Sequence, residues 1–128
     1  MSVTMDHIFD ENQPIYLQIK NRINAMILRG GYKPGDKLPG VVDAAMHYRV
    51  NHNTIQRVYQ ELIRDGVAVA RRGEGTFVTE DVTVLKKLQS ELQDYYLANF
   101  VDQMLQLGYQ AQDLIQILQA YLAHPRQD

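Results

Sequence analysis

Apolar residues in the first half of the chain recur at the spacing of amphipathic helices. Over residues 13–29 the isoleucines gather on one helical face, Pro14 suits a first helical position, and Gly30 follows the last turn. The next segment contains Pro34-Gly35, a pair suited to a type II turn. The pattern therefore predicts a first helix over 13–29 followed by a turn.

Two further helices are predicted close together. Residues 41–48 form a short helical segment, and a longer one runs over 52–65. Asn51 is a good N-cap for the longer helix, and Gly66 is a suitable residue to end it. Because only a tight turn separates the two segments, the sequence predicts a helix-turn-helix arrangement.

A β-hairpin is predicted directly after these helices. Short β-prone runs at 67–69 and 76–78 flank residues 70–75, whose two glycines permit a hairpin tip. Three helices followed by a basic hairpin describe a winged helix-turn-helix domain, which we expect over residues 1–80. The fold class is therefore expected to be mainly α, with a small β-hairpin wing.

The last part of the chain, residues 81–128, is expected to form a two-helix tail. Helical periodicity resumes there, breaks at Gly108 and returns over 111–122. The apolar stripe of the first tail helix is broad, and it either packs on the N-terminal domain or forms a dimer interface. We favour dimerisation, because two free-standing helices cannot cover such faces by themselves. The residues expected at this interface are Leu85, Leu88, Leu92, Tyr96, Phe100 and Met104.

Composition excludes several classes of protein. A chain of 128 residues corresponds to about one domain, and the absence of cysteine excludes disulfides and thiolate metal sites. The first 14 residues lack the long apolar run of a signal peptide, and no stretch approaches the ~18 apolar residues of a membrane span. We therefore expect a cytoplasmic protein without a membrane segment.

The charge distribution indicates a local basic surface. The net charge is −2, which argues against nucleic-acid binding by the chain as a whole. However, residues 1–80 hold 10 basic and 9 acidic side chains, whereas 81–128 hold 3 and 6. Residues 49–76 contain five arginines against three acids. The basic residues thus concentrate around the third helix and the hairpin.

The outer face of the third helix is typical of a DNA-reading surface. At 100° per residue, its apolar residues gather on one side, opposite Asn53, Gln56, Arg57, Gln60 and Arg64. Amide and guanidinium groups form bidentate hydrogen bonds with adenine and guanine edges in the major groove. The alternative is a solvated helix face, although such faces more often mix Lys with Glu.

The predicted hairpin tip carries Arg71 and Arg72 beside a flexible turn at Gly73. Such arginines contact phosphates or enter a narrow minor groove. The alternative is a solubilising loop, which Glu74 would suit. The position of the hairpin after a DNA-reading helix favours DNA contact.

Catalysis and metal binding find little support in the sequence. The four histidines are scattered and none has partners at metal-ligand spacing, so we expect no metal site and no cofactor. A DNA role suits His52 better than metal binding, because it begins the third helix. Neither a nucleophilic triad nor a phosphate-binding glycine loop is present, so we do not expect an enzyme.

Four segments in order resemble the GntR family of bacterial transcriptional regulators. The opening helix begins Gln-Pro-Ile-Tyr-Leu-Gln-Ile at 13–19, and the turn Pro-Gly-Asp-Lys-Leu-Pro occupies 34–39. Residues 50–62 are similar to the family's recognition helix and 71–78 to its wing. The short two-helix tail resembles the YtrA subfamily. The DNA-facing positions that the resemblance implies are Asn51, His52, Asn53, Thr54, Gln56 and Arg57 in the helix, with Arg72 and Gly73 in the wing.

The sequence departs from the family pattern at the start of the second helix. Where the family usually has a capping serine and a DNA-contacting arginine, this chain has Gly40 and Val42. His52 likewise replaces the Arg or Pro that members often carry. One common DNA contact is therefore expected to be absent, and the base preference of relatives does not transfer to this chain.

These features predict a bacterial transcriptional regulator, acting as a repressor. Such a protein would bind a short inverted-repeat operator in double-stranded DNA as a homodimer, and would release it on a signal such as a small-molecule effector. The alternative is a winged-helix module that docks another protein and does not read DNA.

Overall fold

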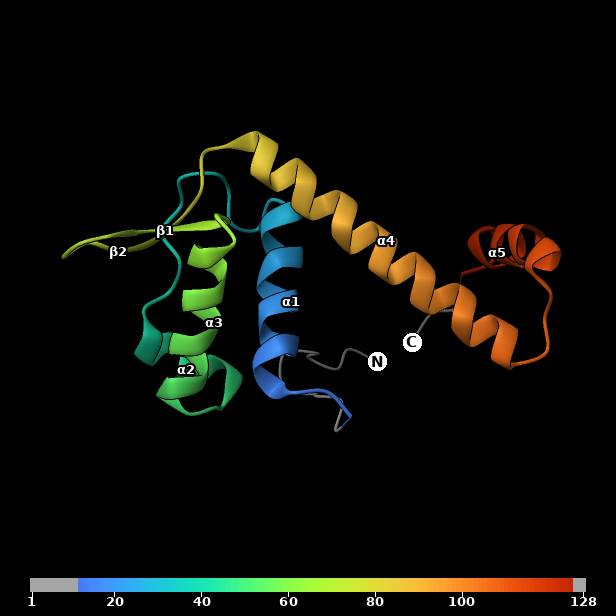
Figure 1. Ribbon diagram of the computed structural model, residues 1–128, viewed down its shortest axis with the longest axis horizontal. Helices are drawn as coiled ribbons and strands as arrows, with labels where there is room; N and C mark the ends of the chain where they lie inside the picture. The colour runs from blue at the N-terminus through green and yellow to red at the C-terminus, as the bar shows by residue number, and fades with distance from the viewer. Residues whose placement is uncertain (1–11, 126–128) are drawn as a thin grey trace. The chain divides into compact units, whose positions relative to one another are not determined.

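The computed structural model describes residues 12–125. They divide into two compact units, one ending at Leu88 and the other beginning at Gln89. The first unit contains the elements α1 (Ile15–Leu28), α2 (Val41–Tyr48), α3 (His52–Arg64), β1 (Ala68–Arg71), β2 (Gly75–Val78) and the first turns of α4 (Val82–Gln106). Figure 1 shows α1 beside α3 and the β1–β2 hairpin extending away from the helices.

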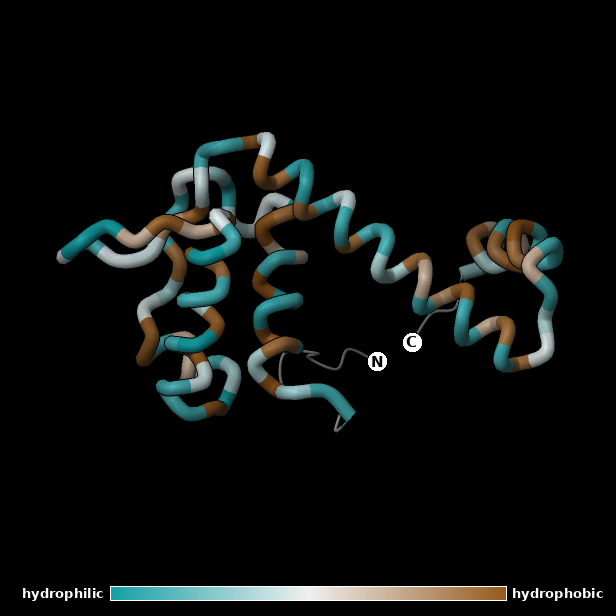
Figure 2. Tube along the Cα trace, in the orientation of Figure 1, coloured by the Kyte–Doolittle hydropathy of each residue, from teal (hydrophilic) through white to brown (hydrophobic). Residues whose placement is uncertain are grey.

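The core of the first unit forms where α1, α2 and α3 meet. Ile19, Ile55 and Leu62 are completely buried, as the helical spacing of the apolar residues predicted. In Figure 2 the hydrophobic residues of α1 and α3 recur at helical intervals along both tubes. Fully burying an aliphatic side chain contributes about 1.5–3 kcal/mol. These contacts therefore hold the three helices in a fixed arrangement.

Short backbone signals set the helix boundaries. The Asn51 side chain accepts a hydrogen bond from the Asn53 amide at 2.7 Å, so the predicted N-cap of α3 is confirmed. Arg49 has a φ of 58°, a left-handed conformation that turns the chain sharply between α2 and α3. Pro14, predicted as the first helical residue, is instead the N-cap of α1, because its ψ of 136° is extended. The helix begins one residue later, at Ile15.

The hairpin is longer than the sequence suggested. β1 and β2 are antiparallel, and their ladder continues to the pair Arg71 and Gly75. The turn is therefore confined to residues 72–74, where the Glu74 amide donates to the Arg71 carbonyl at 2.9 Å. The predicted tip of 70–75 was too wide because β pairing extends past Ala70.

A third extended segment, which the sequence analysis did not pair with the hairpin, flanks β2. Lys37 forms an isolated antiparallel bridge with Phe77. The Leu38 amide donates to the Thr76 carbonyl, and the Val78 amide donates to the Asp36 carbonyl, both at 2.8 Å. Backbone hydrogen bonds therefore join the hairpin to the segment that precedes α2.

The first turns of α4 belong to the winged-helix unit. Val84, Leu85 and Leu88 are partly buried and pack against its core. This packing explains why the unit ends at Leu88 and not at residue 80, where the sequence analysis divided the chain. Leu85 and Leu88, which the sequence places at the expected dimer interface, are thus already partly covered within one chain.

The second unit contains the rest of α4, a short 3-10 helix η2 (Ala111–Asp113) and α5 (Leu114–Ala123). Gly108, with a φ of 98°, interrupts the helices at the predicted position. Asp113 and Gln110 form a capping box that starts the last helical segment. Between residues 12 and 125, α4 has no buried residue and α5 has only Leu114.

Candidate nucleic-acid interface

The first two turns of α3 present polar side chains to solvent. Asn51, His52, Asn53 and Gln56 are exposed, and Thr54 is partly buried. Their exposure follows from the helical period, since Ile55, Val58, Tyr59 and Leu62 occupy the opposite, buried face. The Asn51 side-chain oxygen caps the helix, which leaves its amide nitrogen as a donor for another group. This end of α3 therefore offers amide and imidazole groups on a fixed backbone.

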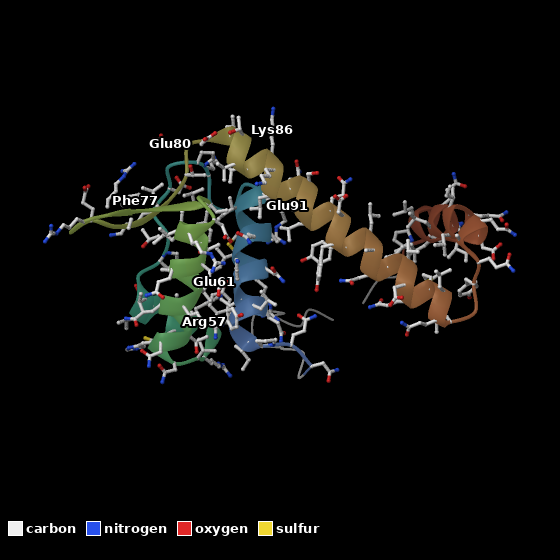
Figure 3. All side chains as sticks on the ribbon, in the orientation of Figure 1. Arg57, Glu61, Phe77, Glu80, Lys86 and Glu91 are labelled. Atoms are coloured by element: carbon white, nitrogen blue, oxygen red, sulfur yellow. The ribbon has the colours of Figure 1, made fainter. Side chains whose placement is uncertain are left out.

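Arg57 has intramolecular partners that the sequence did not reveal. Its guanidinium carbon lies 3.6 Å from the centroid of the Tyr16 ring on α1, and its Nε lies 3.5 Å from a Glu61 carboxylate oxygen. Figure 3 shows Arg57 and Glu61 on α3, on the side that faces α1. The side chain is still 59% exposed, so one face of the guanidinium remains accessible. The geometry favours a positioned cation over a freely moving base reader.

The other end of α3 carries a network of ion pairs. Lys20 of α1 approaches Glu61 at 3.1 Å and Asp65 at 2.8 Å, and Arg64 lies 3.8 Å from Glu61 and 3.5 Å from Asp65. Gln60 is exposed beside this network. Two acids thus neutralise much of the positive charge that Arg57 and Arg64 bring to the helix.

Burial and pairing act in opposite directions on this network. Burial tends to lower the pKa of Lys20, but its hydrogen bonds and charge interactions with Asp65 and Glu61 raise the pKa overall. Burial tends to raise the pKa of Asp65, yet the hydrogen bond from Lys20 and the nearby cations lower it overall. Both shifts favour the charged pair, which ties α1 to the C-terminal end of α3.

The wing presents Arg71, Arg72 and Gly73 at its exposed tip. The Arg71 guanidinium lies 4.3 Å from the centroid of the Phe77 ring, and this cation–π contact holds it against the hairpin. Arg72 is exposed in the turn itself. The two arginines therefore differ, since the first is stacked on the sheet and the second projects from the tip.

Lys37 adds a cation that the sequence analysis missed. Its side chain lies against Gly75, so closely that a Cβ at that position would come within 2.8 Å of the Lys37 Cε. Gly75 also has a φ of 125°, which other residues rarely adopt. Lys37 is exposed and joins the basic residues of the wing. Its bridge to Phe77 joins residues far apart in the sequence, which a local pattern cannot predict.

The start of α2 is weakly equipped for DNA contact. Gly40 is its N-cap without a side-chain hydrogen bond, and Val42 is 55% exposed in the first turn. An exposed valine offers no hydrogen bond to a phosphate. DNA could therefore approach Gly40 and Val42, but neither has a side chain that would form a hydrogen bond with it.

The described residues offer neither a metal site nor a membrane-spanning helix. Within residues 12–125, the histidine and carboxylate side chains form no group of three or more that could hold a metal ion. No helix in that range combines the length and apolarity needed to cross a membrane. The basic, exposed surface of α3 and the wing remains the candidate functional site.

A helix-turn-helix with a basic antiparallel wing defines a winged helix-turn-helix DNA-binding domain. The family model described as "Bacterial regulatory proteins, gntR family" matches residues 15–78. The chain belongs to the GntR family of bacterial transcriptional regulators, which are DNA-binding proteins and not enzymes.

Similar proteins support this assignment over most of the chain. An uncharacterized HTH-type transcriptional regulator, YhcF of Bacillus subtilis, is 39% identical over 91% of this chain and 97% of its own length. The repressor YtrA of the same organism is 43% identical, over 53% of this chain and 52% of its own. A solved GntR family regulator from Listeria monocytogenes has a TM-score of 0.79 at 35% identity, covering 88% of this chain and 98% of that one.

Proposed function

We propose that this chain is a cytoplasmic repressor that binds a short inverted-repeat operator as a homodimer. The observation that carries the DNA-reading part is the exposed, polar first half of α3 on a buried apolar base. The name of YtrA, "HTH-type transcriptional repressor", supports repression as the mode of action. The short tail favours the YtrA-like subfamily.

In this proposal α3 enters the major groove with its N-terminal end toward the bases. His52, Asn53 and Gln56 then reach base edges, because amides pair with adenine and an imidazole accepts or donates one hydrogen bond. Asn51 and Thr54 lie at the helix N-terminus, where backbone amides attract a phosphate. This half of the helix determines sequence preference.

Arg57 has a positioning role in the proposal, whereas Gln60 and Arg64 have a peripheral one. The Tyr16 ring and Glu61 hold the Arg57 guanidinium. It can therefore contact a phosphate from a fixed position while it stays stacked on Tyr16 of α1. Arg64 is shared between two acids and is less available. We therefore assign Arg57 to orientation on the DNA backbone, and Arg64 and Gln60 to the periphery.

The wing supplies contacts that do not depend on base sequence. Arg71, Arg72 and Lys37 place three cations along the hairpin, and Gly73 lets the backbone at the tip approach the DNA closely. Such groups bind phosphates or lie in a narrow minor groove. Their loss would weaken binding to most sequences similarly.

The tail supplies the proposed dimer contact. Leu92, Phe100 and Met104 are half-buried and Tyr96 is 52% exposed within one chain. On α5, Leu118 and Leu122 are 41% and 65% exposed. A symmetric contact between two copies would cover these residues on both chains. It would also fix the spacing between the two recognition helices and hence between operator half-sites.

Selection of bound duplexes from a random DNA pool tests this function. We expect an inverted-repeat consensus whose half-sites are about one helical turn apart. A Gln56→Ala variant, selected in parallel, should lose preference at one symmetry-related pair of positions. Recovery of no enriched sequence, or of a single half-site without symmetry, would contradict the proposal.

A further inference from the structure

The winged-helix unit contains a cavity on the side of α2 that faces α1. Its volume is about 290 Å³, and its walls come from α1, the turn after it, α2 and α3. Ile23, Leu38 and Ala44 are buried and form an apolar base. A dry cavity of roughly 150 Å³ suffices for benzene, so this one has room for a single ring with a short side chain. The cavity therefore has the size of a small-molecule site.

Three tyrosines surround this apolar base. Tyr48 and Tyr59 are buried and Tyr32 is partly buried. The Tyr59 hydroxyl donates to the Pro39 carbonyl at 2.6 Å, which holds that ring in place. Burial raises the pKa of Tyr59, and interaction with Tyr32 and Tyr48 raises it further, so the phenol stays neutral. Neutral aromatic rings around an apolar floor attract a cation through their faces.

Two polar side chains of α2 lie at the rim of the cavity, and one of them is a carboxylate. Asp43 and His47 both line the cavity from α2 and are exposed. The His47 ring is engaged edge-on with Tyr48 at a centroid distance of 4.7 Å. Asp43 carries the carboxylate on this rim, and the lining residues found between positions 12 and 125 include neither Lys nor Arg. The lining is therefore aromatic within and anionic at the opening.

We propose that this cavity binds a small aromatic or apolar amine. The ring or alkyl part would occupy the space above Ile23 and Leu38, and the ammonium group would lie among the tyrosine faces with Asp43 as its counterion. A carboxylic acid of the same shape would meet Asp43 without a cation to balance it. The site selects ligands by charge as well as by size.

Ligand binding here would act on DNA recognition directly, a consequence that rests on the proposed function. The cavity is walled by α2, the first helix of the helix-turn-helix, and by Tyr59 of α3. An occupant that alters the packing of α2 would move the helix that supports the reading helix. This places a signal-sensing site inside the DNA-binding domain itself.

Titration by two-dimensional NMR without DNA tests the site. The probes are 2-phenylethylamine, its neutral analogue 2-phenylethanol and its anionic analogue phenylacetate. We expect saturable shifts on Ala44, Leu38 and neighbouring amides with the amine, weaker ones with the alcohol and none with the acid. Absence of saturable shifts on these residues, or equal binding of the acid, would overturn the proposal.

Asp43→Asn is the decisive variant, since the side chain is exposed and its loss of charge should not disturb folding. It should lower amine affinity about three- to tenfold and leave alcohol affinity unchanged. Glu91→Gln on α4 removes the same charge from a residue that does not line the cavity and should change neither affinity. An amine preference that survives Asp43→Asn would refute the charge-selective site. Because no DNA is present, this result is independent of operator binding.

Discussion

The winged-helix unit and the tail differ sharply in how they place apolar side chains. In the first unit Ile19, Ile55 and Leu62 are fully buried, whereas in the tail Ile115 and Leu107 are 71% and 73% exposed. Among the described residues of α5 only Leu114 is buried. Within one chain, therefore, the first unit covers its large apolar side chains, whereas the tail helices leave theirs exposed, as the proposed dimer contact requires.

Truncation of a core side chain should have the largest effect on the free energy of unfolding, much larger than the same truncation in the tail. We expect Leu62→Ala to lower the free energy of unfolding by about 2–5 kcal/mol, because truncation of this buried side chain leaves a cavity in the core. Leu107→Ala, the same change at a tail position that is exposed within one chain, should alter it by less than about 0.5 kcal/mol at protein concentrations too low for dimers to form. Denaturant unfolding measures both, and equal losses would break the comparison.

Within α3, neighbouring residues should separate base reading from positioning. Gln56→Ala should cost about 1–3 kcal/mol on the selected operator and little on random DNA. Arg57→Ala should weaken binding to both duplexes to a similar extent, because Tyr16 and Glu61 hold that side chain and the proposal assigns it to the DNA backbone. Fluorescence anisotropy measures the affinity of each variant for the two duplexes. A uniform loss with Gln56→Ala would remove it from base reading.

The wing should contribute through charge. The double variant Arg71→Ala with Arg72→Ala should reduce the slope of log affinity against log salt by about one unit per lost phosphate contact. Lys86→Ala with Lys87→Ala removes the same charge from α4 and serves as the matched control. If the control flattens the slope as much as the wing variant, net charge and not the wing is responsible.

The smallest effect is expected from the ion pairs between α1 and α3. The pKa of Asp65 is lowered by folding, so its contribution to stability is present above about 3.8 and is lost as pH falls through the lower folded value. The pKa of Lys20 is raised, so its contribution is present below 10.5 and is lost as pH rises through the higher folded value. Asp65→Asn should cost less than about 1 kcal/mol at neutral pH and little near pH 2. Unfolding curves across pH check this, and a loss that persists in acid would contradict it.

Local signals were enough to predict much of the fold. The cap at Asn51, the short α2 and the break at Gly108 depend on neighbouring residues, and the structure confirms all three. Periodicity likewise predicted that Gln56 and Arg57 lie outside the core.

The features that sequence reasoning missed depend on contacts between distant residues. The stacking of Arg57 on Tyr16 joins two helices, and Lys37 meets β2 through a bridge to Phe77. The apolar stripe of α4 is continuous in sequence, so periodicity could not reveal that Leu88 packs on the winged-helix core. A pattern shows which face is apolar but not which surface covers it.

The proposed dimer contact of the tail, which would bring two DNA-binding units onto one operator, can be disrupted by the variant Tyr96→Asp. Tyr96 is 52% exposed in one chain, so the change should spare folding, while a carboxylate in a dimer interface would be desolvated without a partner. Gln93→Asp, at another exposed position of α4, is the matched control. Sedimentation equilibrium at micromolar concentration should show a dimer for the parent chain and Gln93→Asp, and a folded monomer with weak operator binding for Tyr96→Asp. A parent chain that is monomeric yet binds its operator tightly, or a Tyr96→Asp variant that stays dimeric, would contradict the account.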